Sequence, residues 1–225
     1  MTVRPTLLLV HGAWHGGWCW KQVQSALDAE AIETYTVDLP SAGGRSGIAG
    51  DVRAIRELLA AVEGPVVVVA HSYGGIPVSQ AVADAPNVVR IIYVAAFQLD
   101  AGESLLGYTG AAAPLEPHGL QPVPDEPVTL FYADVPRREA EEAAARLVPQ
   151  STDSFSDVLE QAGWHTIPST YIVCEQDHAL PASLQEALAA RATEVHHLAS
   201  CHSPFLSMPG EFAALLSKIA LQSHA

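Results

Sequence analysis

A small polar cluster follows four consecutive valines about a third of the way along the chain, at residues 71–75, with the letters HSYGG. A buried strand that runs directly into a serine between small residues is typical of the sharp strand-to-helix turn written G-x-S-x-G, although Ala70 replaces the first glycine here. Small neighbours are needed because the serine backbone is strained and packs closely. The pattern predicts that Ser72 is a nucleophile. The alternative is that Ser72 only caps the helix that begins near Gly75.

A serine hydroxyl becomes a good nucleophile only when a base takes its proton and a third group holds that base. On a sheet with such a turn, the acid follows a later strand and the histidine follows the last one. Asp177 follows the fifth apolar stretch of the chain, and His202 follows the sixth. We therefore expect Asp177 to hold the ring of His202, and His202 to activate Ser72.

Chance placement must be considered, because the chain has 10 histidines and a second acid in a similar position. Asp100 follows the fourth apolar stretch and is the rival partner for the imidazole. His202 is the only histidine expected in the loop after the last strand, since His196 and His197 lie within that strand and should point to opposite faces. Three further histidines are expected near the crevice as hydrogen-bonding groups: His11, His71 and His165.

Attack on an ester carbonyl places negative charge on its oxygen, which rigid backbone N–H groups must stabilise. One donor is expected to be Tyr73, directly after the nucleophile. The other is expected in the glycine-rich stretch after the first apolar run, at Ala13 or alternatively Trp14. His11 and His15 are four residues apart, but no helix is expected to align them, so we predict no metal site and no cofactor.

Short apolar stretches alternate with helical patterns along the chain. Continuous apolarity is typical of strands that are covered on both faces, and the alternation predicts a doubly wound α/β sandwich with about six mostly parallel strands. The expected strands are 6–10, 33–39, 66–70, 88–96, 169–174 and 193–199. The expected helices between and after them are 18–30, 50–61, 75–85, 182–192 and 210–222.

Residues 97–168 separate the fourth strand from the fifth, which is too long for a structureless loop. We predict a small helical cap here, inserted into a core formed by residues 1–96 and 169–225. An insertion at the carboxyl edge of a parallel sheet covers the ligand crevice; the alternative is a decorative subdomain. Within it lie a proline-rich stretch, a charged helix and a second helical stretch, at 113–127, 137–147 and 155–162.

Aromatic residues on the cap or near the strand ends predict an apolar pocket for the acyl or alcohol group, with packing inside the cap as the alternative. They are Trp14, Phe97, Tyr108, Phe131, Trp164 and Phe205.

The formal net charge of -14 disfavours nucleic acid and anionic membrane surfaces as partners. Three cysteines without CxxC spacing favour free, buried thiols in a reducing compartment, and the apolar run at the N-terminus is too short for a signal peptide, so we expect a cytoplasmic protein. The oligomeric state does not follow from the sequence.

Five stretches, in order, resemble the α/β-hydrolase superfamily, and within it the branch of plant methylesterases, hydroxynitrile lyases and small bacterial esterases: LLLVHGAWHGGWCW, DLPSAGGRS, AHSYGG, YIVCEQDHALP and CHSPFLSMPGEFAALL. The resemblance implies an α/β-hydrolase fold, a triad of Ser72, Asp177 and His202, and oxyanion donors at Ala13 and Tyr73. The lyases of this branch carry a threonine in the oxyanion loop and a lysine after the catalytic histidine. Gly12 and Ser203 stand at these positions here, which favours hydrolysis.

The sequence thus predicts a serine hydrolase that cleaves a carboxylic ester or lactone of a small to medium apolar substrate through an acyl-enzyme on Ser72. Two alternatives remain. One is a lyase-type enzyme that uses the Ser–His pair as a proton shuttle, and the other is a small-molecule binding protein on the same fold.

Overall fold

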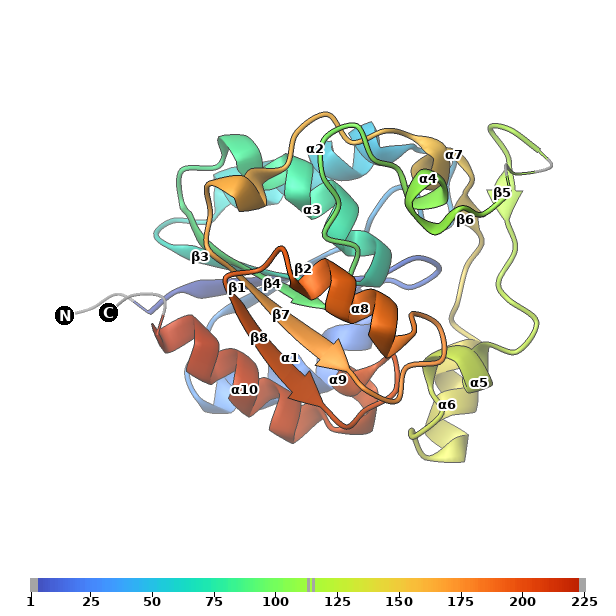
Figure 1. The fold of residues 1–225 in the computed structure, drawn as a ribbon. Coiled ribbons are helices and arrows are strands. Elements are labelled where there is room, and N and C mark those ends of the chain that lie inside the picture. Colours follow the sequence, from blue (N-terminus) through green and yellow to red (C-terminus); the bar gives the residue numbers. More distant parts are fainter. Residues whose placement is uncertain (1–3, 113, 115, 223–225) are drawn as a thin grey trace.

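A six-stranded sheet forms the centre of the molecule in the computed structural model, which describes residues 4–112, 114 and 116–222 (Figure 1). Every pairing between neighbouring strands of this sheet is parallel, and the strand order is β2-β1-β3-β4-β7-β8. The strands are β1 (Thr6–Val10), β2 (Thr34–Val37), β3 (Val66–His71), β4 (Val88–Val94), β7 (Ser169–Cys174) and β8 (Glu194–Leu198). All six lie within or beside the predicted stretches.

Helices cover both faces of this sheet, which explains the continuous apolar runs of the central strands. Along β3, Val66 and Val68 pack into one core cluster while Val67 and Val69 pack into the other, and all four are fully buried. On the first face lie α2 (Ile48–Ala61), α3 (Gly75–Ala81) and α8 (Ala182–Ala189). On the second lie α1 (Lys21–Ala29), α9 (Pro204–Ser207) and α10 (Pro209–Gln222). The predicted doubly wound α/β sandwich is confirmed.

Three single helical turns extend two of these helices, one before α1 and one at each end of α3, and a fourth lies before β7. They are η1 (Gly17–Trp20), η2 (Ser72–Gly74), η3 (Val82–Asp84) and η4 (Gly163–His165). Of the described helices, none is long and apolar enough to cross a membrane.

The segment between β4 and β7 contains short helices and a two-stranded antiparallel sheet (Figure 1). Its elements are α4 (Leu105–Thr109), β5 (Leu120–Gln121), α5 (Pro127–Phe131), α6 (Arg137–Ala144), β6 (Gln150–Ser151) and α7 (Asp153–Ser156). The charged helix is present, but the helical stretch predicted over 155–162 is wrong, since α7 ends at Ser156. Asp157 leaves the helical region (φ -59°, ψ 141°), and its carboxylate accepts a hydrogen bond from the N–H of Ile48 at the start of α2.

Candidate active site

Ser72 lies at the turn where β3 passes into η2 and α3. Its φ of 52° is in the left-handed region, which is strained for a residue with a side chain. The glycines after it are needed because the turn packs on neighbouring backbone. A Cβ on Gly74 would lie 2.5 Å from the carbonyl oxygen of His11, and one on Gly75 would lie 2.6 Å from that of Phe97. The local sequence therefore forces a tight turn with Ser72 at its apex.

Asp177 and His202 meet at the carboxyl ends of β7 and β8, where their Oδ2 and Nδ1 atoms are 2.6 Å apart. Both side chains are buried. Because a carboxylate only accepts, Nδ1 of His202 carries the hydrogen, and Nε2 keeps the lone pair that a general base needs. The structure brings together the two side chains that the sequence analysis paired, and this contact orients the His202 ring.

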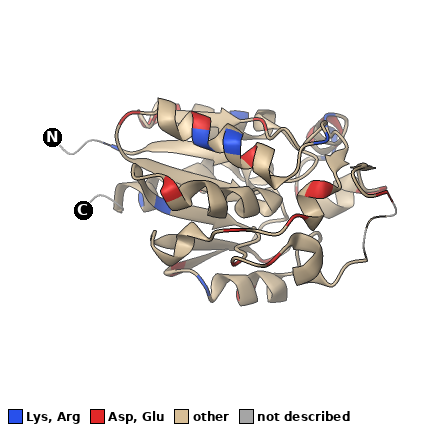
Figure 2. Ribbon diagram, turned by 90° about the horizontal axis from the view of Figure 1, so that it is seen from above, with Lys and Arg blue, Asp and Glu red and all other residues tan. Residues whose placement is uncertain are grey.

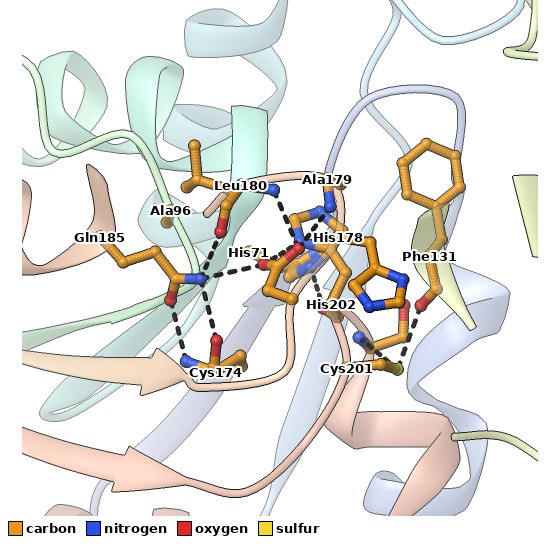
Figure 3. Close-up of polar contacts among 12 residues, drawn as sticks. His71, Ala96, Phe131, Cys174, His178, Ala179, Leu180, Gln185, Cys201 and His202 are labelled. Carbon is orange, nitrogen blue, oxygen red and sulfur yellow. Dashed lines mark hydrogen bonds and ion pairs between the residues drawn. The ribbon is translucent and has the colours of Figure 1, made fainter. Parts of the chain in front are cut away.

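The carboxylate of Asp177 is itself held by three N–H donors, from Ala179, Leu180 and Gln185, which Figure 3 labels. Its Oδ1 accepts from the backbone N–H groups of Ala179 and Leu180 at 2.7 and 2.9 Å. Its Oδ2 accepts from Nε2 of Gln185 at 3.0 Å. Gln185 is fully buried on α8 and also bridges both backbone polar groups of Cys174 at the end of β7. Sequence reasoning missed Gln185, although a glutamine at a core-facing position of a helix was a usable signal.

Ser72 and His202 line the same cavity, of about 390 Å³. In the described part of the chain, no hydrogen bond joins the Ser72 hydroxyl to the His202 ring. Such bonds are often long in ligand-free sites and tighten when substrate binds. The two side chains thus share one cavity wall without the contact that proton transfer requires.

The rival acid, Asp100, faces a different histidine. Its Oδ1 lies 2.9 Å from Nε2 of His165, and both side chains are largely exposed. The hydrogen bond from His165 lowers the pKa of Asp100. His178, next to Asp177, contacts the carbonyl oxygen of Thr129 through Nδ1 at 3.1 Å instead. The structure therefore places Asp177, and not Asp100, beside His202.

The loop after β1 lies beside the turn that carries Ser72. Ala13 and Trp14 from this loop and Tyr73 from the turn all line the cavity. The backbone N–H of Trp14 is occupied, since it donates to Oε1 of Gln150 at 3.1 Å. No acceptor for the N–H of Ala13 is found among the described residues, so this group is free for a ligand. Of the two candidates in this loop, the geometry favours Ala13.

Three buried histidines support these loops as neutral hydrogen-bonding groups. His15 donates from Nδ1 to the carbonyl of Ala13 at 2.7 Å and accepts from the Tyr132 hydroxyl at Nε2, 2.8 Å away. His71 donates from Nε2 to the carbonyl of His202 at 2.8 Å, and its Nδ1 has no partner within the described chain. Burial lowers the pKa of His15 to about 3, and lowers that of His71 well below its usual value.

His11 also has both ring nitrogens in use. Nδ1 lies 2.8 Å from the carbonyl oxygen of Gly12, and Nε2 accepts from the N–H of Leu39 at 3.0 Å. Burial lowers the pKa of His11. Across residues 4–112, 114 and 116–222, no group of three or more His, Cys, Asp or Glu side chains could hold a metal ion.

The cavity wall is mostly apolar, with no Asp, Glu, Lys or Arg among its described residues. It is lined by Ala13, Trp14, Ser72, Tyr73, Phe97, Leu105, Leu106, Thr109, Ala111, Ala112, Gln121, Phe131, Phe155, Ala179, Leu180 and His202. Three predicted aromatic residues are therefore in place, namely Trp14, Phe97 and Phe131. Phe155, which also lines it, was not anticipated.

The other three predicted aromatic residues are placed away from this cavity. Phe205 is fully buried on the opposite face of the sheet, with its ring 4.7 Å from that of Trp20. Trp164 stacks on His165 at 3.9 Å. The guanidinium of Arg191 lies 5.4 Å from the ring centre of Tyr108. Phe205 packs in the second core cluster, Tyr108 and Trp164 pack against the first, and none of the three lines the cavity.

Comparison with known proteins agrees with this architecture. The profile of the Alpha/beta hydrolase family matches residues 7–215. The chain is 31% identical to the alpha/beta hydrolase nvfD of Aspergillus novofumigatus (strain IBT 16806), over 92% of this chain and 93% of that protein. It is 32% identical to the carbendazim hydrolyzing esterase of Nocardioides sp. (strain SG-4G), over 69% of this chain and 73% of that protein.

Solved structures show the same fold. The methylesterase MES16 from Arabidopsis superposes with a TM-score of 0.83 at 24% identity, covering 97% of this chain and 99% of that one. The similar proteins also include methylesterase 7 of Arabidopsis thaliana, 26% identical over 95% of this chain and 95% of that protein, and with the Nocardioides esterase it agrees with the branch that the sequence motifs resemble. The chain belongs to the alpha/beta hydrolase family.

Proposed function

We propose that this chain is a serine hydrolase that cleaves a carboxylic ester or lactone of a small to medium uncharged substrate through an acyl-enzyme on Ser72. One observation carries the proposal: the 2.6 Å contact between Asp177 and His202 lies at the wall of the cavity that also holds Ser72. An imidazole held in one tautomer at the same cavity wall as a serine is the arrangement that nucleophilic catalysis needs.

The reaction would proceed in two halves. Nε2 of His202 takes the proton of Ser72 as its oxygen attacks the carbonyl carbon, and Asp177 stabilises the imidazolium that forms. The N–H groups of Ala13 and Tyr73 bind the negative charge that develops on the carbonyl oxygen. The alcohol leaves with the proton from His202, and a water activated by the same ring then releases the acid from Ser72.

An uncharged substrate fits the cavity because its described wall offers no ionic partner. A carboxylate or ammonium group buried there would lose its hydration without compensation, which costs several kcal/mol. The formal net charge of -14 also repels anionic substrates before they reach the site. The proposed uncharged substrate thus follows from the lack of charged side chains in the described cavity wall and from the negative electrostatic potential of the protein.

The lyase alternative is disfavoured by the space around Gly12. A Cβ on Gly12 would lie 2.8 Å from Cβ of Ser72 and 2.9 Å from Nδ1 of His71, so the threonine of the lyase pattern finds no room. Ser203 stands where the lyases have a lysine, and its buried hydroxyl has no partner in the described structure. Neither residue supplies the cation that would hold a cyanide leaving group.

We further propose a cytoplasmic location with no nucleic-acid or membrane partner. The three cysteines are free and buried, which suits a reducing compartment. Lys and Arg lie scattered over several elements and do not gather in one basic patch (Figure 2). This scatter of cations and the formal net charge of -14 disfavour binding to phosphate backbones and anionic headgroups.

Incubation with p-nitrophenyl butyrate and a serine-directed phosphonate tests the proposed function. The wild type should turn over the ester and gain one phosphonate adduct, which peptide mapping assigns to Ser72. The Ser72→Ala variant should lose on the order of 10⁶ in kcat, by analogy with serine proteases, and should take no label. Ser25→Ala, on the exposed face of α1, is the matched control and should behave as wild type. Full esterase activity in Ser72→Ala would refute the nucleophile, and labelling without turnover of any ester or lactone would support a lyase or binding protein.

A further inference from the structure

A buried carboxylate lies beneath the nucleophile turn and plays no part in the proposed chemistry. Asp51, in α2, is fully buried. It accepts three hydrogen bonds: from the N–H and the hydroxyl of Ser41, at 2.9 and 2.5 Å, and from the hydroxyl of Tyr73, at 2.6 Å. Tyr73 is also the residue whose backbone N–H is expected to receive the oxyanion. The carboxylate thus fixes the side chain of an oxyanion donor.

A buried amide continues this network to the other oxyanion segment. Gln150, in β6, is fully buried. Its Nε2 donates to the hydroxyls of Ser41 and Ser154, both at 2.8 Å. Its Oε1 accepts a 3.1 Å hydrogen bond from the backbone N–H of Trp14, the residue directly after Ala13. Ser41 therefore joins Asp51 to Gln150, and the two ends of the network reach Tyr73 and Trp14.

Stability alone does not account for such a cluster. A buried carboxylate is costly unless it is fully hydrogen-bonded, and well-packed apolar residues in its place are often as stable or more so. The neighbouring core positions of α2 are apolar, as at Val52 and Ile55, so the helix can pack there without polar groups. What an apolar residue does not provide is a fixed orientation of the Tyr73 hydroxyl, since a satisfied network rigidifies the groups it joins.

We propose that Asp51 and Gln150 are positioning residues, which hold Tyr73 and Trp14 so that the N–H groups of Tyr73 and Ala13 point at one oxyanion. This inference rests on the proposed serine-hydrolase function. Gln150 also keeps the N–H of Trp14 occupied, so that the Ala13 N–H alone in that loop faces the ligand. Because Gln150 comes from the segment between β4 and β7, that segment is part of the positioning device.

Three variants probe the network without touching the reacting atoms. Asp51→Asn keeps the size but replaces one acceptor oxygen by a donor; Tyr73→Phe removes one hydroxyl and leaves the backbone N–H; Gln150→Met removes the acceptor for Trp14. Outright loss of an oxyanion donor costs on the order of 10² to 10³ in kcat, so misplacement of one should cost about 10- to 100-fold. The KM for p-nitrophenyl butyrate should stay within about 2-fold, because Asp51 and Gln150 do not line the cavity and Tyr73→Phe removes only the hydroxyl that bonds to Asp51.

The rate of phosphonylation of Ser72 separates the two roles, because it should not change if Asp51 and Gln150 only stabilise the fold. The tetrahedral, negatively charged product occupies the oxyanion site, so the labelling rate should fall in parallel with kcat. Asp51→Asn combined with Gln150→Met should lose less than the product of the single losses, since both act through Ser41. Asp157→Asn is the matched control. Its carboxylate caps the same helix at Ile48 through a 3.0 Å hydrogen bond but contacts neither oxyanion segment, so kcat should stay within about 2-fold.

The outcomes separate this inference from the proposed function. If Asp51→Asn and Tyr73→Phe are folded and keep kcat and labelling within about 2-fold of wild type, or lose no more than Asp157→Asn, the positioning role is refuted while Ser72 remains the nucleophile. If Ser72→Ala keeps its activity, or the wild type turns over no ester, both proposals fail. Should Asp51→Asn not fold, Tyr73→Phe decides alone, because it keeps the carboxylate and its two bonds to Ser41.

Discussion

Substitution of Gly12 by alanine should damage the site and the fold together. The added Cβ would lie 2.8 Å from Cβ of Ser72 and 2.9 Å from Nδ1 of the buried His71, and neither is the end of a flexible chain. Overpacking of this kind costs about 1–3 kcal/mol. Replacing glycine by alanine also stabilises the folded state by about 0.4–1 kcal/mol, because it lowers the conformational entropy of the unfolded chain. The net loss is therefore about 1–2 kcal/mol, which lowers the Tm of a protein of this size by about 2–8 °C.

The assay compares Gly12→Ala with Gly210→Ala. Gly210 lies in the first turn of α10, and a Cβ there meets nothing within 4 Å, so the same chemical change should be neutral or raise the stability by up to about 1 kcal/mol. Thermal unfolding should show Tm shifts of opposite sign or clearly different size. Hydrolysis of p-nitrophenyl butyrate should fall at least about 10-fold in Gly12→Ala only, because Ser72 must move. Equal Tm and equal kcat in the two variants would refute the steric argument.

Three further predictions concern the groups around the site. Tyr132→Phe leaves the buried Nε2 of His15 without its donor and should destabilise the protein by about 1–3 kcal/mol in urea unfolding. Asp177→Asn should lower kcat by about 10⁴ with little change in KM, because an amide favours the wrong tautomer of His202; a loss under 10-fold contradicts the assignment of the acid. Burial lowers the pKa of His15 to about 3, so between pH 6.5 and 3 a proton binds to this imidazole only in the unfolded chain. The free energy of unfolding of the wild type should therefore fall by about 3 kcal/mol from pH 7 to pH 4.5, relative to that of His15→Gln.

The parts of the fold that depend on short-range pattern were predictable from the sequence. Four consecutive valines indicate a strand buried on both faces, and the small residues after Ser72 indicate a tight turn, because both properties follow from local sterics. The insertion was harder. Its second helical stretch was predicted over 155–162, but α7 ends at Ser156. The carboxylate of the next residue, Asp157, caps α2 at Ile48, which is more than a hundred residues away in the sequence. Hydrophobic periodicity carries no information on such a contact.

The candidate reacting residues could be named from the sequence, whereas most of the residues that position them were not. Ser72 and His202 follow strand ends, and strand ends are visible in the sequence. Asp51 and Gln150 lie within a helix and a two-residue strand, and their neighbours in the chain give no sign of a buried polar partner, whereas the core-facing position of Gln185 on α8 was a signal that sequence reasoning missed. Their roles depend on which elements meet in three dimensions, and this depends on the sheet order and on the path of the segment between β4 and β7.

Asp51 offers a last prediction, on stability and pH. Burial raises its pKa to about 6, and the nearby Asp157 acts in the same direction, while the bonds from Ser41 and Tyr73 oppose them. The folded protein therefore keeps a proton on Asp51 that the unfolded chain releases near pH 4. Stability falls as the pH rises through this window and is constant above it. Two units at about 1.4 kcal/mol each give about 3 kcal/mol.

The difference between wild type and Asp51→Asn isolates this effect, because both proteins carry the same buried histidines, whose influence has the opposite sign. The unfolding free energy of Asp51→Asn minus that of wild type should rise by about 2–3 kcal/mol between pH 4 and pH 7.5 in urea titrations. Asp28→Asn, which changes an exposed carboxylate on α1, should show a much smaller change. A difference that does not vary with pH would mean that the pKa of Asp51 is the same in the folded and the unfolded chain. In that case the hydrogen bonds from Ser41 and Tyr73 fully offset the cost of burying the negative charge, so they would hold the carboxylate under the oxyanion donors more strongly than its raised pKa indicates.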